Sequence, residues 1–298
     1  MNKKWAKGLT AFAMGIYAAS SQATLVTYND FSNTSGLTMV GSAGTAVTSD
    51  GTVMRLTPAA SSQTGAVYST SPITLGSNDT FSTTFQFRFT SPGGIDPADG
   101  ITFLLAANTT GIGGPGVGMG YQGVPNSVAI EFDTYNNAGY GLGNNDGNSS
   151  NHVSIDTNGV LTNTALSNVY GHQTCDFSSG YLTPGCMSNG DLWKVTIGYN
   201  GTNLNVILND PAVGTSFTAI SSYPINIASY LGTNTAYVGF TAGTGAGWEN
   251  HDIVNWQFAN TTELASSGVP EPASLALVGL GFAAIGRIRR QKARRKLA

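Results

Sequence analysis

Short runs in which apolar and polar residues alternate recur along the chain, and turn-forming residues separate them. Alternation with a period of two is typical of β-strands, whose successive side chains point to opposite faces. Outside the two ends, the chain shows no helical period and no internal repeat, so we expect one all-β domain folded as a β-sandwich. The predicted strands span residues 53–56, 66–68, 81–89, 100–105, 127–132, 152–156, 193–199, 204–208, 236–241 and 253–258.

Charged residues make up only 10% of the chain, and they are segregated along it. Residues 24–268 hold 15 of the 16 acidic residues but only 3 of the 13 basic ones, Arg55, Arg88 and Lys194, a balance near −12. So acidic a domain would repel polyanions, and we expect no nucleic-acid partner. Bound cations would neutralise part of the charge, and a surface dominated by Thr, Ser and Asn suits an exported protein.

The N-terminal end has the pattern of a secretory signal peptide. Three lysines precede an apolar stretch at residues 9–19, and Ser21-Gln22-Ala23 places small residues at the −3 and −1 positions. We expect residues 1–23 to be the signal peptide and the mature domain to span residues 24–262. A retained N-terminal membrane anchor is the alternative, although the apolar stretch is short for a span.

The C-terminal end combines Val269-Pro270-Glu271-Pro272, an apolar stretch at residues 273–286 and seven basic residues. A transmembrane helix needs about 20 apolar residues, so this stretch is marginal, and the basic cluster would stay in the cytoplasm. After a linker at 263–268, residues 269–298 resemble the PEP-CTERM sorting signal. The resemblance implies an exported protein that a short apolar helix holds in the inner membrane until an exosortase-type enzyme removes the tail. An ordinary C-terminal anchor is the alternative.

Cys175 and Cys186 are the only cysteines in the chain. In an oxidising compartment, an even pair that closes a short loop predicts a disulfide. A metal role would need further ligands, for which His172 is the only candidate. The polar segment 170–190 around them is expected to be a surface loop pinned by the disulfide, and a recognition role for it is open.

The segment from Glu131 to His152 predicts a divalent metal site. Glu131, Asp133 and Tyr135 alternate at the end of a predicted strand, so their side chains leave by one face. Two like charges this close repel each other unless a cation lies between them, and the next loop returns Asp146 and His152 as further ligands. The alternative is a polar surface loop whose residues only satisfy turn geometry.

The ligand types suggest two ions. An oxygen-rich set with one imidazole suits Mn²⁺ or a similar transition metal. Asp133 and Asp146 could bridge to a second ion, completed by the Tyr135 carbonyl and the Asn137 side-chain oxygen, an all-oxygen set that suits Ca²⁺. The set with one imidazole, for the transition metal, consists of Glu131, Asp133, Asp146 and His152.

Further blocks accompany this segment: Ala98-Asp99-Gly100-Ile101-Thr102-Phe103, the glycine run at 111–120, His152-Val153-Ser154-Ile155-Asp156, residues 238–245, and Ile253-Val254-Asn255-Trp256-Gln257-Phe258. In this order, from about residue 27 to residue 258, they resemble the legume-type (L-type) lectins. The resemblance implies the jelly-roll sandwich of concanavalin A, in which metals and sugar lie in loops over a concave sheet.

By this resemblance, the Asp99 carboxylate accepts hydrogen bonds from two sugar hydroxyls, and the peptide bond before it is cis. Asn137 would bind calcium through its oxygen and the sugar through its amide nitrogen. Tyr135 would offer its ring to the apolar face of the sugar, with a plain packed aromatic as the alternative. The remaining contacts would be backbone N–H groups, from Ala246, Gly247 and either Gly116 or Gly118.

Two departures from the family restrict these implications. The stretch from Asn137 to Asp146 is several residues longer than in the legume proteins, so Asn144 or Asn145 could take the role given to Asp146. Gly247 stands where some legume lectins have an acidic or larger residue, so the preferred monosaccharide does not follow. The neighbouring Trp248 either stacks on an outer sugar or packs against the protein.

The sequence therefore predicts an exported, metal-dependent carbohydrate-binding protein, acting at the cell surface or in an exopolysaccharide matrix. It does not predict an enzyme. Laminarinase-type glycoside hydrolases share the sandwich and a Glu-x-Asp-x-x-Glu strand, but Asn136 replaces the second glutamate, so the carboxylate pair is incomplete. A structural matrix or adhesion protein that keeps the fold but binds no free sugar is the alternative, and a homo-oligomer is left open.

Overall fold

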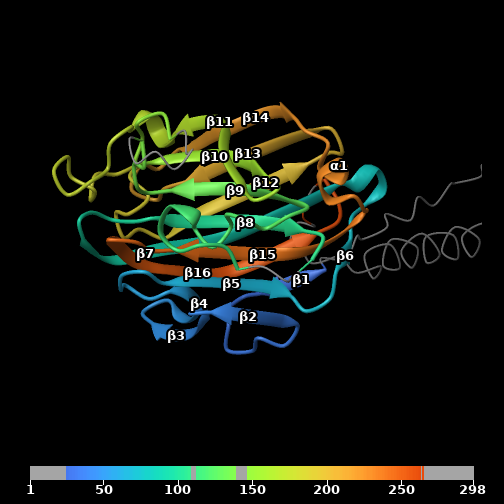
Figure 1. The fold of residues 1–298 in the computed structure, drawn as a ribbon, viewed down its shortest axis with the longest axis horizontal. Coiled ribbons are helices and arrows are strands. Elements are labelled where there is room, and N and C mark those ends of the chain that lie inside the picture. The colour runs from blue at the N-terminus through green and yellow to red at the C-terminus, as the bar shows by residue number, and fades with distance from the viewer. Residues whose placement is uncertain (1–24, 109–111, 139–145, 263, 265–298) are drawn as a thin grey trace, which may run out of the picture.

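The computed structural model describes residues 25–108, 112–138, 146–262 and 264. The predicted signal peptide, nearly all of the linker, and the sorting tail with its apolar helix lie outside these residues. Within them, the chain forms two antiparallel sheets packed face to face (Figure 1), which confirms the predicted all-β jelly-roll sandwich. No helix in this described part is long and apolar enough to cross a membrane.

The strands divide between a back sheet and a front sheet. The back sheet contains β1 (Val26–Tyr28), β3 (Gly44–Thr48), β4 (Gly51–Thr57), β7 (Phe81–Gly94), β12 (Trp193–Tyr199), β13 (Asn203–Asn209), β14 (Ser216–Pro224) and β16 (Gly247–Ala259). The front sheet contains β2 (Leu37–Gly41), β5 (Thr64–Ser69), β6 (Ile73–Thr74), β8 (Gly100–Ala106), β9 (Ser127–Asp133), β10 (His152–Thr157), β11 (Val160–Asn168) and β15 (Thr235–Gly243).

The strand order is β14-β13-β12-β7-β16-β4-β3 in the back sheet and β11-β10-β9-β8-β15-β5-β2 in the front sheet, with β1 beside β16 and β6 beside β15. All ten predicted strands fall within observed strands. The described domain has almost no helix, as expected, and its one α-helix is the single turn α1 (Ile227–Leu231). Its N-cap is the Asn226 side chain, which accepts from the Ser229 N–H, and Gly232 ends it in the left-handed region. One turn is too short to show a helical period.

The core lies between the sheets and is rich in phenylalanine. Phe85, Phe87 and Phe89 alternate along β7, so all three point inward from one face of that strand. The Phe85 ring meets Phe132 of β9 and Phe240 of β15 at centroid distances of 5.7 and 4.8 Å. These cross-sheet aromatic contacts set the spacing between the two layers.

A second apolar cluster covers the outer face of the front sheet. Residues 112–124 fold across that face, where Met119 and Tyr121 pack with Leu104 and Ala129. The Tyr121 hydroxyl accepts the Gly159 N–H at 2.9 Å, which ties this cover to the turn after β10. Side chains on the outer face of β9 are therefore buried, although that face of a sandwich sheet ordinarily meets water.

Replacing Phe85 with alanine is expected to lower the free energy of unfolding by about 3–5 kcal/mol, because a cavity would open between the sheets. The control is Ile207→Ala on β13, where the side chain is 38% exposed and the expected change is within about 1 kcal/mol. Urea denaturation followed by tryptophan fluorescence measures both. Equal losses would contradict the assigned core.

Candidate functional site

Three of the predicted metal ligands converge on the covered face of the front sheet. Glu131 and Asp133 lie two residues apart on β9, and His152 begins β10 directly opposite Asp133. One ligand atom from each lies within 4.8 Å of the others, and all three side chains are fully buried. His152 Nε2 is 3.0 Å from Glu131 Oε1.

Asp146 and the turn after β9 fold around these carboxylates. The Asn137 N–H donates to Asp146 Oδ2, and the Asn163 amide donates to Asp146 Oδ1 at 2.9 Å. Asp133 Oδ1 accepts the Tyr135 N–H at 2.7 Å. These bonds place Tyr135 next to Asp133 and Asn137 next to Asp146, so all four predicted ligands of the second ion lie together. Asn144 and Asn145 lie outside the described residues.

Burial shifts the protonation of the cluster. It raises the pKa of Glu131 to about 7, with a contribution from the charge of Asp146 and against a hydrogen bond with Asp156. Burial and the charges of Asp146 and Glu131 raise the pKa of Asp133 well above its usual value. Burial lowers the pKa of His152 to about 4, so its imidazole is neutral near pH 7, which is the form that binds metals.

Several buried oxygen atoms in and beside this cluster have no hydrogen-bond partner. Among the described residues they include Asp133 Oδ2, Asn137 Oδ1 and Asp99 Oδ2. Buried polar atoms are nearly always paired, and an unpaired buried carboxylate oxygen is strongly unfavourable. A group of acceptors without donors, next to a neutral imidazole, fits divalent cations.

Asp156 also belongs to this cluster, although it was not among the predicted ligands. It lies on β10 four residues after His152, on the same face, and hydrogen-bonds with Glu131. Burial and the charge of Glu131 raise the pKa of Asp156 to about 10, so it carries a proton at neutral pH. The N–H groups of Thr162 and Asn163 donate to its Oδ1 at 2.7 and 2.9 Å. Its even spacing from His152 is the signal in the sequence that could have identified it.

Asp99 connects the cluster to an open cavity of about 270 Å³. Its N–H donates to the Gly243 carbonyl at 3.1 Å, and its carbonyl accepts the Thr134 N–H at 3.0 Å. The peptide bond between Ala98 and Asp99 is cis, as the resemblance implied. Burial, then the charges of Glu249 and Asp146, raise the pKa of Asp99 to about 8. The lining residues are Ile95, Ala98, Asp99, Pro115, Gly116, Val117, Tyr135, Asn137, Gly245, Ala246 and Gly247.

The two glycines left open by the sequence occupy different positions. Gly116 lines the cavity, whereas Gly118 does not. Both N–H groups already donate within the protein, that of Gly116 to Thr244 at 3.0 Å and that of Gly118 to Pro115 at 3.3 Å. Val117 lies between them and lines the cavity, and the hydrogen bonds of the described loops and turns do not include its N–H. Val117 is therefore the better candidate donor, and a search for glycines would not have found it.

On the opposite wall, Ala246 and Gly247 line the cavity and Trp248 does not. The Trp248 ring lies against β7, where a Cβ built on Gly93 would be 2.5 Å from its Nε1. The structure therefore favours packing for Trp248. Another cavity, of about 680 Å³, lies between residues 25–36 and 69–73, and none of the predicted ligands lines it.

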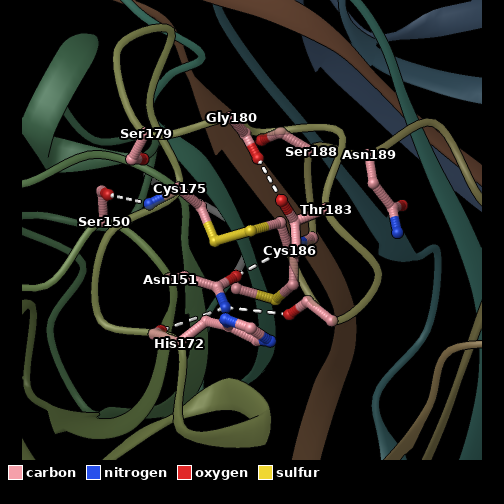
Figure 2. Close-up of a disulfide and its surroundings, with 12 residues drawn as sticks. Ser150, Asn151, His172, Cys175, Ser179, Gly180, Thr183, Cys186, Ser188 and Asn189 are labelled. Atoms are coloured by element: carbon pink, nitrogen blue, oxygen red, sulfur yellow. Dashed lines mark hydrogen bonds between the residues drawn. A yellow bond between two sulfur atoms is a disulfide. The ribbon is translucent and has the colours of Figure 1, made fainter. Parts of the chain in front are cut away.

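The predicted disulfide between Cys175 and Cys186 is present, with a Cα–Cα distance of 5.7 Å (Figure 2). Both half-cystines are buried. The Cys175 N–H donates to Ser150 Oγ at 2.9 Å, so the loop that the disulfide closes contacts the segment that leads into β10. The alternative metal role for these cysteines is thereby removed.

Two family models match the chain. The legume lectin domain matches residues 24–272, and the PEP-CTERM protein-sorting motif matches residues 268–290. The chain belongs to the legume lectin family. Lectins of this family bind carbohydrate without catalysis, so the predictions of a lectin and of a protein that is not an enzyme are confirmed.

The chain is 31% identical to a seed lectin of Styphnolobium japonicum over 214 residues, 68% of this chain and 64% of that protein. It is 32% identical to a lectin of Lens culinaris subsp. tomentosus over 226 residues, 69% of this chain and 72% of that protein. The fold is similar to that of a Bauhinia forficata lectin in complex with GalNAc, with a TM-score of 0.62, 20% identity, and coverage of 80% of this chain and 98% of that one.

Metal removal is expected to make the stability of this protein fall as the pH rises from 6.5 to 8. Without cations, the pKa values of Asp99 and Asp133 are raised in the folded state, so folding retains protons that the unfolded chain releases. Stability from such groups is present at low pH and is lost as the pH rises through the folded-state pKa. The pKa of His152 is lowered, so it adds little slope above its ordinary value of about 6.5.

Thermal melts after EDTA treatment measure this dependence. The expected result is a lower Tm at pH 8 than at pH 6.5, with little difference when Ca²⁺ and Mn²⁺ are present. A metal-free Tm that rises over this interval would contradict the assigned burial of negative charge.

Proposed function

We propose that this chain is an exported lectin in which bound cations assemble the sugar site. The observation that carries the proposal is the group of unpaired buried oxygens, because Asp99 and Asn137 belong both to that group and to the cavity lining. These two side chains connect the acidic cluster to the open surface. Without a counter-charge, Asp99 would take up a proton and lose acceptor capacity for sugar hydroxyls.

Two ions would share the acidic cluster. Mn²⁺ or a similar transition metal would be held by Glu131, Asp133, Asp146 and His152, a set of oxygens with one neutral imidazole. Ca²⁺ would be held by Asp133, Asp146, the Tyr135 carbonyl and the Asn137 side-chain oxygen. When bound, the ions supply the positive charge that keeps the carboxylates ionised. Asp156, whose carboxyl lies beside that of Glu131, would help to fix the orientation of that ligand.

A single sugar residue would bind in the cavity of about 270 Å³. The Asp99 carboxylate accepts from two hydroxyls, the Asn137 amide donates to the sugar, and the Tyr135 ring packs on its apolar face. The backbone donor would be Val117, in place of Gly116 or Gly118, together with Ala246 and Gly247. The complex of the similarly folded Bauhinia forficata lectin with GalNAc supports a monosaccharide ligand, while the preferred sugar of this chain stays open.

Two other functions are less well supported. Glycoside hydrolases need a pair of carboxylates at the bond to be cut, and Asp99 is the only carboxylate among the residues that line this cavity. A structural matrix protein without sugar binding is disfavoured because the described cavity is open and carries unpaired acceptors. Neither alternative explains why Asp99 and Asn137 are aimed at the same space.

The PEP-CTERM match supports export. We propose that residues 1–23 direct secretion and that residues 269–298 hold the precursor in the inner membrane. An exosortase-type enzyme would remove this tail and leave the domain at the cell surface or in the exopolysaccharide matrix. Self-association of the domain stays a prediction.

Asp99→Asn is expected to weaken glycan binding at least tenfold, because the amide replaces one of the two acceptor oxygens with a donor and removes the negative charge, and a hydrogen bond to a charged group contributes about 1.5–3 kcal/mol. A glycan array followed by calorimetry, with Ca²⁺ and Mn²⁺ present, measures the effect. The matched control is Asp30→Asn, an exposed loop residue outside this cavity. EDTA should abolish binding by the wild-type protein. If the wild-type protein holds its ions but binds no glycan, the proposed function is contradicted.

A further inference from the structure

The segment from residue 169 to residue 190, here called the disulfide loop, is held in a defined position. Asn151 is fully buried beneath it. The Asn151 oxygen accepts the Met187 N–H at 3.0 Å (Figure 2). The Asn151 amide nitrogen donates, at 3.0–3.3 Å, to three carbonyl groups of the loop, those of Val169, His172 and Gly185. These bonds and the disulfide fix a loop that has little regular structure.

A second cavity, of about 110 Å³, lies beside this loop. Tyr135 lines both this cavity and the larger one next to Asp99, so the two spaces adjoin across a single side chain. The other lining residues all carry oxygen atoms suited to sugar hydroxyls: Asp96, Asn136, Ser150, Thr174 and Asp176.

The disulfide loop also places an aromatic pair near these cavities. The rings of Phe177 and Tyr181 meet edge to face at 5.3 Å. The Phe177 N–H donates to Asp96 Oδ1 at 2.8 Å, which ties this pair to a residue of the second cavity. Phe177 is 43% exposed, and Ile95, next to Asp96 and lining the first cavity, is 52% exposed. Single exposed apolar side chains are common, so Phe177 and Ile95 matter here only through their position beside the two cavities.

We propose that the disulfide loop forms a second sugar subsite, so that this lectin recognises an oligosaccharide of at least two residues. This inference rests on the proposed function of the first cavity. The second sugar lies across Tyr135, its hydroxyls bond to the oxygens of the small cavity, and its CH face packs on Phe177. Tyr181 positions Phe177 through their ring contact.

The charge of the second cavity selects the class of glycan. Asp96 and Asp176 line it, and none of its lining residues is basic. A uronic acid or another anionic sugar placed there would meet like charges without a compensating cation, so the expected ligand is a neutral oligosaccharide.

The test uses the full chain in mild detergent, loaded with Ca²⁺ and Mn²⁺. The probes are methyl glycosides of mannose, glucose and galactose together with their matching neutral di- and trisaccharides, followed by calorimetry on the best pair. Phe177→Ala should weaken oligosaccharide binding about tenfold and leave monosaccharide binding within twofold. Phe177→Tyr should retain the wild-type preference. The control is Val47→Ala, an exposed apolar residue on β3 of the back sheet.

A double Cys175→Ser, Cys186→Ser variant should show the same selective loss, and circular dichroism checks that it folds. If it does not fold, Phe177→Ala and Phe177→Tyr still decide the question. The proposal is overturned if Phe177→Ala weakens both ligands equally, changes neither, or alters the oligomeric mass in light scattering, which would make the aromatic pair a contact between copies. Absence of monosaccharide binding by the wild-type protein would instead count against the proposed function.

Discussion

Repulsion among buried carboxylates is the constraint on which the site and its surroundings depend. Glu131, Asp133 and Asp146 are all fully buried, and the charges of Asp146 and Glu131 raise the pKa of Asp133, while the charge of Asp146 also raises the pKa of Glu131. Burial alone already opposes ionisation. Such an arrangement is stable at neutral pH only if protons or cations balance the charge. The carboxylates are therefore either protonated, and unable to bind metal, or ionised around bound cations.

The rest of the sandwich keeps this cluster together. Phenylalanines of the core hold β9 against the back sheet, and Met119 and Tyr121 close the outer face above it. Water is therefore excluded from the ligands except toward the cavity, where Asp99 and Asn137 reach the surface. Because both side chains serve the cluster and the cavity, occupancy of the metal sites and affinity for a glycan should be a single coupled property.

Much of this organisation could be predicted because it depends on local patterns. The period of two placed Glu131 and Asp133 on one face, and His152 does lie opposite Asp133. Other features depend on tertiary contacts that no local pattern encodes. The even spacing of Asp156 from His152 indicates a shared face of β10, but its contact with Glu131 appears only when β10 lies beside β9. The preference for Val117 over Gly116 follows from the hydrogen bond that Gly116 makes to Thr244. The second cavity could likewise not be predicted from the sequence, because residues 96, 135 and 176 are brought together only by the fold.

The most direct test of the central claim is a calorimetric titration of Ca²⁺ into metal-free protein, with and without a saturating neutral glycan. Binding linkage requires any increase in glycan affinity caused by Ca²⁺ to be matched by an equal increase in Ca²⁺ affinity caused by the glycan. We expect at least a tenfold increase in Ca²⁺ affinity when the glycan is present, and no such increase in Asp99→Asn. Ca²⁺ affinity that is unchanged by a glycan shown to bind the same protein would contradict it.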